Sequence, residues 1–244
     1  VEILPEDVET EAMLFHPVRI LAPLAHRQGI DITMVVDPDL PSRLLVDAER
    51  MRQVLHNLVG NAVKFVDEGE VLVQVRRVAQ EGNLHRIRFS VCDTGPGIGE
   101  DVIGTIFEPF VQGSEDLSKR RGGAGLGLTI AHRIVERMGG ELQVRSKVGE
   151  GSEFFFEIVL AAPAGAGRLV PLRFPWTGGA PVAVLVRRAS LRTYVMDLLW
   201  WMGIESVELP VPEAVHTHPE LDRVALVVAD IESLGESDLR ALES

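Results

Sequence analysis

The sequence contains a single cysteine, Cys92, among its 244 residues. One cysteine allows no internal disulfide framework and no cysteine-based metal site. Long hydrophobic runs are also missing. The longest ones, such as 154–160 and 182–186, have the length of strands, so we expect no segment to cross or contact a membrane. No charged and then apolar signal peptide opens the chain.

Basic residues are in deficit as well. The chain carries 24 lysines and arginines against 36 aspartates and glutamates, which gives a net charge of −12. A general nucleic-acid binder needs an excess of cations to meet the phosphate backbone, so this balance argues against that class. With 46% hydrophobic residues the composition is that of a folded protein, and the length suits one large domain or two modest ones.

Periodicity predicts helices and strands over the first two thirds of the chain. Apolar residues at helical spacing predict helices over 18–28, 47–65 and 126–138, with Asp47 as the N-cap of the second. Alternating and β-branched runs predict strands over 30–36, 69–78, 84–93, 141–147 and 152–160, of which the last four form two hairpins. Residues 1–14 are rich in acids and are predicted to be a lead-in outside the core.

A change of composition marks a boundary near residue 163. Four prolines stand among alanines and glycines between 161 and 181, so residues 163–180 are predicted to be a linker. Beyond it, strands are predicted over 182–186, 206–209 and 223–229, with a helix over 191–202. Alternation of strands and helices predicts parallel βα units in a second domain over 181–244.

Three polar residues share one face of the predicted helix 47–65. Asn57, Asn61 and Lys64 are spaced i, i+4 and i+7. An amide oxygen can ligate Mg²⁺, and a lysine can neutralise phosphate charge, so the triplet suits a metal–phosphate ligand. For this triplet alone, the alternative is a solvated polar face.

A turn follows the predicted strand 84–93. Asp93 ends that strand, and Gly95 and Gly97 flank a proline before Ile98. A carboxylate at a strand end can accept a hydrogen bond from an exocyclic amine such as that of adenine, and glycines let the backbone approach a flat ring. By itself the segment is more often a simple turn.

The region 96–127 is rich in glycine and charge. Its end, Gly-Gly-Ala-Gly-Leu-Gly-Leu over 122–128, opens the predicted helix 126–138, and glycine amides at a helix start attract anions. Lys119 and Arg120 precede it and can meet phosphates, although a charge run is usually a solvated face. Phe107 lies in Ile-Phe-Glu-Pro-Phe over 106–110, which alone favours a small satellite core.

The order of these four segments resembles the N, G1, F and G2 boxes of the histidine-kinase ATP-binding domain, in the GHKL ATPase superfamily. The matching stretches are RMRQVLHNLVGNAVKF, DTGPGI, IFEPF and GGAGLGL. The resemblance implies a Bergerat-type α/β sandwich over 15–162, with helices on one face of a mixed sheet and a mobile ATP lid over 108–124. It also implies ATP and Mg²⁺ as ligands. It further implies that this segment lies in the cytoplasm, as part of a longer parent kinase that is either not membrane-bound or anchored in the inner membrane.

The resemblance assigns a role to each matched residue. Asn61 matches the Mg²⁺ ligand, Asp93 the adenine reader, and the glycines before the helix the phosphate lid. The complete set of implied ATP-binding residues is Asn57, Asn61, Lys64, Asp93, Gly95, Gly97, Ile98, Phe107, Lys119, Arg120, Gly123, Gly125, Leu126 and Gly127. Two departures are Ala124, where the family often has threonine, and Glu153, which would put a carboxylate close to the adenine end.

Asn57 distinguishes between branches of the superfamily. Hydrolases that resemble this domain carry a glutamate there, which activates water, and an amide cannot act as that base. The resemblance therefore implies a kinase that transfers the γ-phosphoryl group of ATP to a histidine on a separate dimerisation domain. It also implies that the parent kinase is a homodimer and passes the phosphoryl group on to a response regulator or phosphotransfer protein. None of the seven histidines here has the family's acceptor surroundings.

The tail 181–244 resembles the first part of a flavodoxin-like receiver domain. Asp230 matches the phosphoacceptor position, whereas Arg187 and Arg188 replace the acidic pair that holds Mg²⁺. A kinase domain followed by a partial, degenerate receiver implies a hybrid sensor kinase. The alternative function is a regulatory module whose non-phosphorylatable receiver controls a kinase by docking or by binding a ligand.

Overall fold

The computed structural model describes residues 2–109, 126–169, 180–201, 204–209, 224 and 226–229. The chain divides into two compact units, Val1–Leu169 and Val170–Ser244. Lys119, Arg120, Gly123, Gly125 and Asp230 lie outside the described residues, as does most of the predicted lid. Within the described parts, no helix is both long and apolar enough to cross a membrane.

The first unit is built on a mixed sheet. Its strands are β1 (Glu6–Glu9), β2 (Ile30–Val36), β3 (Arg43–Val46), β4 (Gly69–Glu81), β5 (Leu84–Asp93), β6 (Gln143–Lys147) and β7 (Gly151–Ala161). Their order is β1-β3-β7-β5-β4-β2, with β6 paired to β7. The pair β2–β4 is parallel and the other pairs are antiparallel. The mixed sheet confirms the fold class predicted from the sequence.

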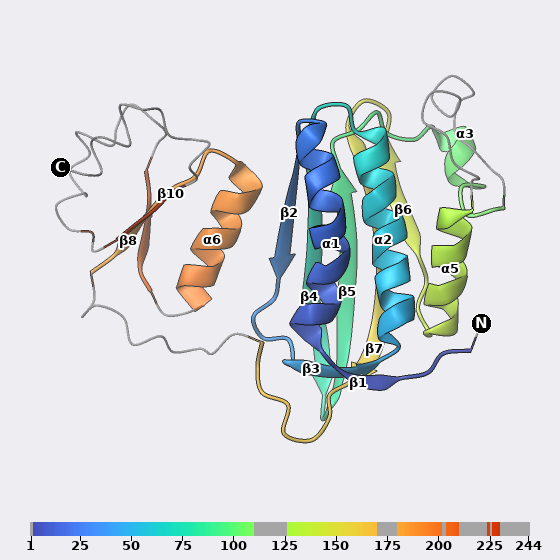
Figure 1. The fold of residues 1–244 in the computed structure, drawn as a ribbon, viewed down its shortest axis with the longest axis horizontal. Coiled ribbons are helices and arrows are strands. Elements are labelled where there is room, and N and C mark those ends of the chain that lie inside the picture. Colours follow the sequence, from blue (N-terminus) through green and yellow to red (C-terminus); the bar gives the residue numbers. More distant parts are fainter. Residues whose placement is uncertain are drawn as a thin grey trace. The chain divides into compact units, whose positions relative to one another are not determined.

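Helices cover one face of this sheet. The long ones are α1 (Thr10–Arg27), α2 (Ala48–Phe65) and α5 (Gly127–Arg137), and a short α3 (Glu100–Ile103) follows β5 (Figure 1). Asp47 caps α2, because its carboxylate accepts a hydrogen bond from the backbone N–H of Arg50 at 3.0 Å. Alternate residues of β5, Ile87, Phe89 and Val91, are at most 1% exposed and belong to the same core as the helices.

The prediction of a lead-in over 1–14 was wrong. Residues 6–9 form β1, which pairs with β3, and α1 begins at Thr10, eight residues before the predicted start. Met13 and Leu14 are each 1% exposed in the core. The number of acidic residues hid this arrangement, because Glu9 of β1 and Glu11 of α1 are exposed while the apolar residues of α1 face the core.

The predicted linker also begins too early. The segment 163–169, which we call the strap, runs along the first unit after β7. Gly167 accepts a hydrogen bond from the N–H of Ser42 at 2.7 Å, and Leu169 donates one to the carbonyl of Leu40 at 2.8 Å. Arg168 forms an isolated bridge with Pro41. Proline and glycine gave this segment the composition of a linker, but its backbone hydrogen bonds attach it to the first unit.

The second unit contains a small parallel sheet. Strands β8 (Val182–Leu185), β9 (Ser206–Glu208) and β10 (Leu226–Ala229) stand in the order β10-β8-β9, and α6 (Ala189–Trp201) connects β8 to β9. The first strand thus lies between the second and third, as in flavodoxin-like folds. The parallel βα units predicted from the sequence are confirmed. Arg187 and Arg188 follow β8 after one intervening residue, Val186.

Candidate functional site

The polar face of α2 is the centre of the candidate site. Asn57, Asn61 and Lys64 are half-buried, so this face is not simply solvated. The amide nitrogen of Asn57 is buried and has no hydrogen-bond partner among the described residues, and the same holds for the hydroxyl of Thr129 on α5. Since buried polar groups are normally paired, two unpaired ones on neighbouring helices indicate a site that a polar ligand completes.

The start of α5 faces Asn57. A Cβ atom added to Gly127 would lie 3.7 Å from the side-chain oxygen of Asn57. Leu126, the N-cap residue of α5, makes no side-chain cap hydrogen bond. The first N–H groups of a helix have no partner within it and carry its positive end, so this helix start attracts an anion beside Asn57.

Asp93 lies near the C-terminal end of α2, two turns beyond Asn57. Its carboxylate accepts a hydrogen bond from the N–H of Gly95 at 2.9 Å, and Gly95 approaches the carbonyl of Phe65, the last residue of α2. Burial raises the pKa of Asp93, and hydrogen bonds from the backbone of Gly95 and Ser152 oppose that rise. The carboxylate is held in place and half-buried, which suits an acceptor for a ligand's N–H.

A second turn supports the Asp93 loop, and the sequence analysis missed it. The hairpin between β6 and β7 donates from the N–H of Gly149 to the carbonyl of Pro96 at 2.8 Å. Ser146 accepts from the N–H of Ile98 at 2.8 Å and donates to the carbonyl of Gly151 at 2.8 Å. The sequence pattern predicted the hairpin of 141–147 and 152–160 but no contact between its turn and the Asp93 loop. Closely spaced glycines in both the Asp93 loop and the hairpin turn were the sequence signal that these two backbones could approach each other.

Phe107 connects the segment after α3 to α5. Its ring stacks on His132 with the ring centroids 4.9 Å apart, and it packs against the main core. Ile98 and Leu128 are also partly buried and pack against the same core. The interpretation of Phe107 as part of a separate satellite core therefore does not hold. This aromatic fixes the chain just before the predicted lid.

Glu153 does not lie where the sequence placed it. Along β7, Phe154 and Phe156 belong to the core under the helices, so Glu153 points to the other face of the sheet. There it accepts from Arg88 at 2.9 Å. Its register partner is Cys92, whereas the partner of Asp93 is Ser152. Closeness in sequence suggested a place near Asp93, but the pleat sends this carboxylate away from the site.

The described site residues thus form a line along α2. Phe65 meets the Asp93 turn at one end, Asn57 meets Gly127 at the other, and Asn61 and Lys64 lie between them on the same face. Eight residues of helix rise about 12 Å, the scale of a nucleotide with its phosphate chain. Among the described residues, no three His, Cys, Asp or Glu side chains gather to hold a metal. A cation here would need an amide oxygen and oxygens from the ligand.

Comparison with known protein families identifies this arrangement. Residues 46–162 match the model of the histidine kinase-, DNA gyrase B- and HSP90-like ATPases. The first unit belongs to this family. It is a histidine-kinase catalytic domain of the kind found in hybrid sensor kinases, which confirms the resemblance of the four boxes.

Individual relatives agree with this assignment. The sensor histidine kinase AruS of Pseudomonas aeruginosa is 41% identical over 165 residues, which are 68% of this chain and 16% of AruS. The sensory/regulatory protein RpfC of Xanthomonas campestris pv. campestris is 43% identical over 143 residues, 58% of this chain and 20% of RpfC. The crystal structure of full-length ShkA in complex with AMPPNP matches 97% of this chain and 47% of ShkA, with a TM-score of 0.76 and 35% identity. The chain spans 16–21% of the first curated bacterial relatives.

Proposed function

We propose that this chain binds Mg²⁺·ATP along α2 and serves as the catalytic module of a hybrid sensor histidine kinase. The observation that carries the proposal is the line of polar residues from Asp93 to Gly127, with the unpaired amide of Asn57 at its phosphate end. The family match and the ShkA structure, which contains the ATP analogue AMPPNP, support the same ligand.

Asp93 recognises the base in this proposal. Its carboxylate accepts from the exocyclic amine of adenine, while Gly95 and Gly97 let the backbone lie against the ring. Gly97 has a φ of +70°, and a Cβ atom added there would overlap the carbonyl of Lys147, so the position requires glycine. Ile98 extends the apolar floor of the base site from the same loop.

The phosphate end belongs to α2 and α5. Mg²⁺ typically keeps one or two protein ligands and takes the rest from phosphates and water, which fits the amide oxygen of Asn61. The metal neutralises phosphate charge when it is bound. Lys64 adds a point charge to the phosphates, and the N–H groups at the start of α5 complete the cradle beside Asn57.

Transfer to a protein, rather than to water, follows from Asn57. An amide cannot remove a proton from water, so the module has no water activator at this position. We propose that the acceptor is a histidine on a dimerisation domain outside this chain, in a parent homodimer that supplies a response regulator or phosphotransfer protein. A steady rate of ATP hydrolysis by this chain would contradict that role of Asn57.

Calorimetry of ATP binding in the presence of Mg²⁺ tests the proposal. Asp93→Asn replaces a carboxylate, which only accepts hydrogen bonds, by an amide that can present its NH₂ to the amine of adenine. Loss of a charge-assisted hydrogen bond costs about 1.5–3 kcal/mol, which lowers the affinity for ATP roughly tenfold or more. Asp101→Asn, at an exposed position of α3, is the matched control and should leave the affinity unchanged. Equal affinity for the wild type and Asp93→Asn would refute the assignment.

The second unit favours a regulatory role beside the kinase. Its three parallel strands have the receiver order, yet Arg187 and Arg188 stand where an active receiver needs Mg²⁺-binding carboxylates. A guanidinium cannot ligate a cation. We therefore expect no phosphorylation of Asp230 when the chain is incubated with acetyl phosphate and Mg²⁺. Mass spectrometry that finds a phosphoryl group on Asp230 at substantial occupancy would contradict this role.

A further inference from the structure

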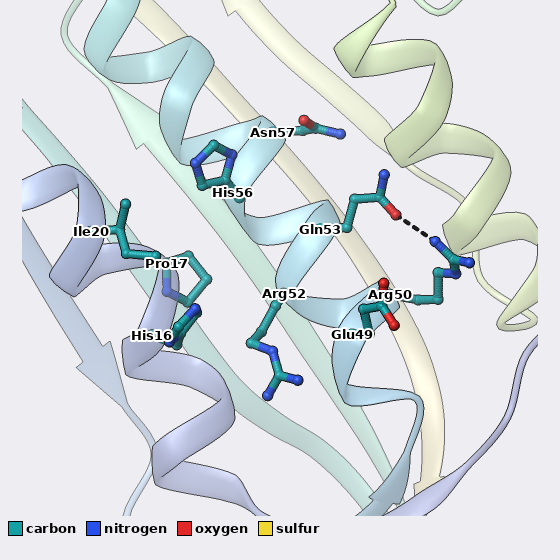
Figure 2. A pocket seen from close by; sticks show the side chains of 9 residues that line it. All are labelled: His16, Pro17, Ile20, Glu49, Arg50, Arg52, Gln53, His56 and Asn57. Atoms are coloured by element: carbon teal, nitrogen blue, oxygen red, sulfur yellow. Dashed lines mark hydrogen bonds between the residues drawn. The ribbon is translucent and has the colours of Figure 1, made fainter.

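The two ends of the proposed nucleotide site differ in their surroundings. Asn57, at the phosphate end, borders a hollow of about 440 Å³ that residues of α1 and α2 line (Figure 2). At the base end, Asp93 belongs to a row of side chains that crosses the sheet. Ser152 on β7 is its register partner, and Ser146 on β6 is the register partner of Ser152. Register partners present their side chains on the same face, so Ser152 lies between Ser146 and Asp93.

The hydroxyl of Ser146 uses its whole capacity for hydrogen bonds. It accepts from the N–H of Ile98 at 2.8 Å, and it lies 2.8 Å from the carbonyl oxygen of Gly151 and 2.9 Å from the hydroxyl oxygen of Ser152. A carbonyl oxygen cannot donate, so the one hydroxyl hydrogen of Ser146 goes to Gly151. The hydrogen between the two serines must therefore come from Ser152.

Ser146 thereby fixes what Ser152 can offer to a ligand. Because the hydroxyl hydrogen of Ser152 goes to Ser146, only lone pairs of its oxygen remain for the side toward Asp93. The ionised carboxylate of Asp93 is likewise an acceptor only. Ser152 is 9% exposed, so solvent has little access to its oxygen. Two neighbouring acceptors in such a place favour a ligand group that brings the hydrogens.

We propose that Ser146 is a positioning residue that makes the base site selective for a 6-aminopurine. It acts through Ser152. With the hydroxyl hydrogen of Ser152 held by Ser146, the edge formed by Ser152 and Asp93 offers only acceptors to the exocyclic amine and repels a carbonyl oxygen at the same position of the ring. This inference rests on the proposed function, because it concerns recognition of the base in the ATP site.

ITP is the probe that isolates this contact. It has the sugar and the phosphates of ATP, and its base carries a carbonyl oxygen in place of the 6-amino group and a hydrogen on N1. Without Ser146, the hydroxyl of Ser152 can rotate and donate its hydrogen to that carbonyl oxygen. The dissociation constant of ITP divided by that of ATP, which we call the selectivity ratio, therefore reports on the base end alone.

Calorimetry of the whole chain with ATP and with ITP, both in Mg²⁺, tests the proposal. Ser146→Ala should lower the selectivity ratio roughly fivefold, which is the scale of one hydrogen bond. Ser146→Thr keeps the hydroxyl and should hold the ratio within about twofold of the wild type. Ser146→Cys keeps the size of the side chain and weakens its hydrogen bonds, so it should also lower the ratio and replaces Ser146→Ala if that variant does not fold.

A double-mutant cycle separates this role from a general loosening of the Asp93 loop. Ser152→Ala removes the oxygen through which Ser146 acts in the proposal, so adding Ser146→Ala to it should leave the selectivity ratio unchanged. Loss of the bond to Ile98, by contrast, would weaken the binding of ATP and ITP alike and would do so whether or not Ser152 is present.

Two matched controls remove polar groups elsewhere. Ser90→Ala makes the same substitution at a position of β5 that is 4% exposed and lies on the opposite face of the sheet from Asp93. Gln53→Ala breaks the hydrogen bond to Arg50, 2.9 Å long, that Figure 2 shows beside the hollow. Both variants should keep the selectivity ratio of the wild type.

Either of two results would overturn the proposal and leave the proposed function intact. The first is a loss of affinity in Ser146→Ala that is equal for ATP and ITP, so that the selectivity ratio does not change. The second is an equal fall of the ratio when Ser146→Ala is introduced into the wild type and into Ser152→Ala. A wild type that binds neither nucleotide would refute the proposed function itself, and this inference with it.

Discussion

Gly151 lies directly against the backbone of Asp93. A Cβ atom at position 151 would overlap the carbonyl oxygen of Asp93, and Gly151 has a φ of +98°. The contact arises because Asp93 and Ser152 are register partners of β5 and β7. The loop that carries the proposed adenine contact is therefore shaped by a glycine 58 positions later in the chain.

Gly151→Ala should destabilise the protein and weaken ATP binding together. The strain of a positive φ and the overlap with backbone add, so we expect a loss of about 3 kcal/mol or more of unfolding free energy. Gly149→Ala is the control, since it has a φ of +82° but nothing within 4 Å of its added Cβ, and should cost about 1 kcal/mol. Urea denaturation measures both, and equal losses would disprove the contact.

Asn61→Ala should separate metal-dependent from base-dependent binding. If the amide oxygen of Asn61 ligates Mg²⁺, its removal weakens ATP binding in Mg²⁺ by tenfold or more and hardly changes the affinity for adenosine. Calorimetry with both ligands makes the comparison. An equal loss for ATP and adenosine would mean that Asn61 shapes the helix and does not hold the metal.

Adenosine binding should depend on acid pH through Asp93. Burial raises the pKa of this carboxyl above its ordinary value of 3.8, so protonation in the folded protein begins at a higher pH than for an exposed aspartate. The ionised form is the better acceptor, and adenosine affinity should therefore fall as the pH is lowered through that raised pKa. Adenosine is chosen because it has no phosphates to titrate. The same profile in Asp93→Asn would show that another group is responsible.

The raised pKa of Asp93 has the opposite effect on stability. Between 3.8 and the raised folded-state pKa, the folded protein binds more protons than the unfolded chain, so the contribution of Asp93 to stability decreases as the pH rises through that window. Asp93→Asn should remove this dependence. Urea denaturation of the two proteins across the acid range, compared at each pH, measures the difference.

Asp39 should be a stability determinant of the first unit. Its carboxylate accepts from Arg77 at 3.0 Å and lies 2.8 Å from the guanidinium of Arg168 in the strap. Asp39 is 13% exposed, so Asp39→Asn should cost about 1–3 kcal/mol and speed hydrogen exchange at the N–H of Leu169.

Asp7→Asn provides the matched control for Asp39. It breaks the pair with Arg43, in which both side chains are 43% exposed, and should lower the unfolding free energy much less than Asp39→Asn does. Equal losses for the two substitutions, or unchanged exchange at Leu169 in Asp39→Asn, would show that the strap is held by its backbone hydrogen bonds alone. ATP affinity should be unchanged in both variants.

The local pattern of the sequence was enough to predict α2 and β2. Asp47 and the apolar period of 47–65 predicted the helix and its cap, and β2 has the predicted bounds, Ile30–Val36. The shared face of Asn57, Asn61 and Lys64 also follows from helical spacing alone. The interactions behind these features span a few residues, so their signal is contained in a short stretch of sequence.

Tertiary structure decided the rest. The pairing of β2 with β4, the contact of Gly151 with Asp93 and the attachment of the strap join residues far apart in the chain. No local period encodes such partners. Glu153 illustrates the physical reason. Successive residues of a strand face opposite sides of the sheet, so Ser152 lies on the same face as Asp93, and Glu153, one residue later, lies on the opposite face. The sequence by itself determined which residue types the site has, and the register of the sheet decided which of them face it.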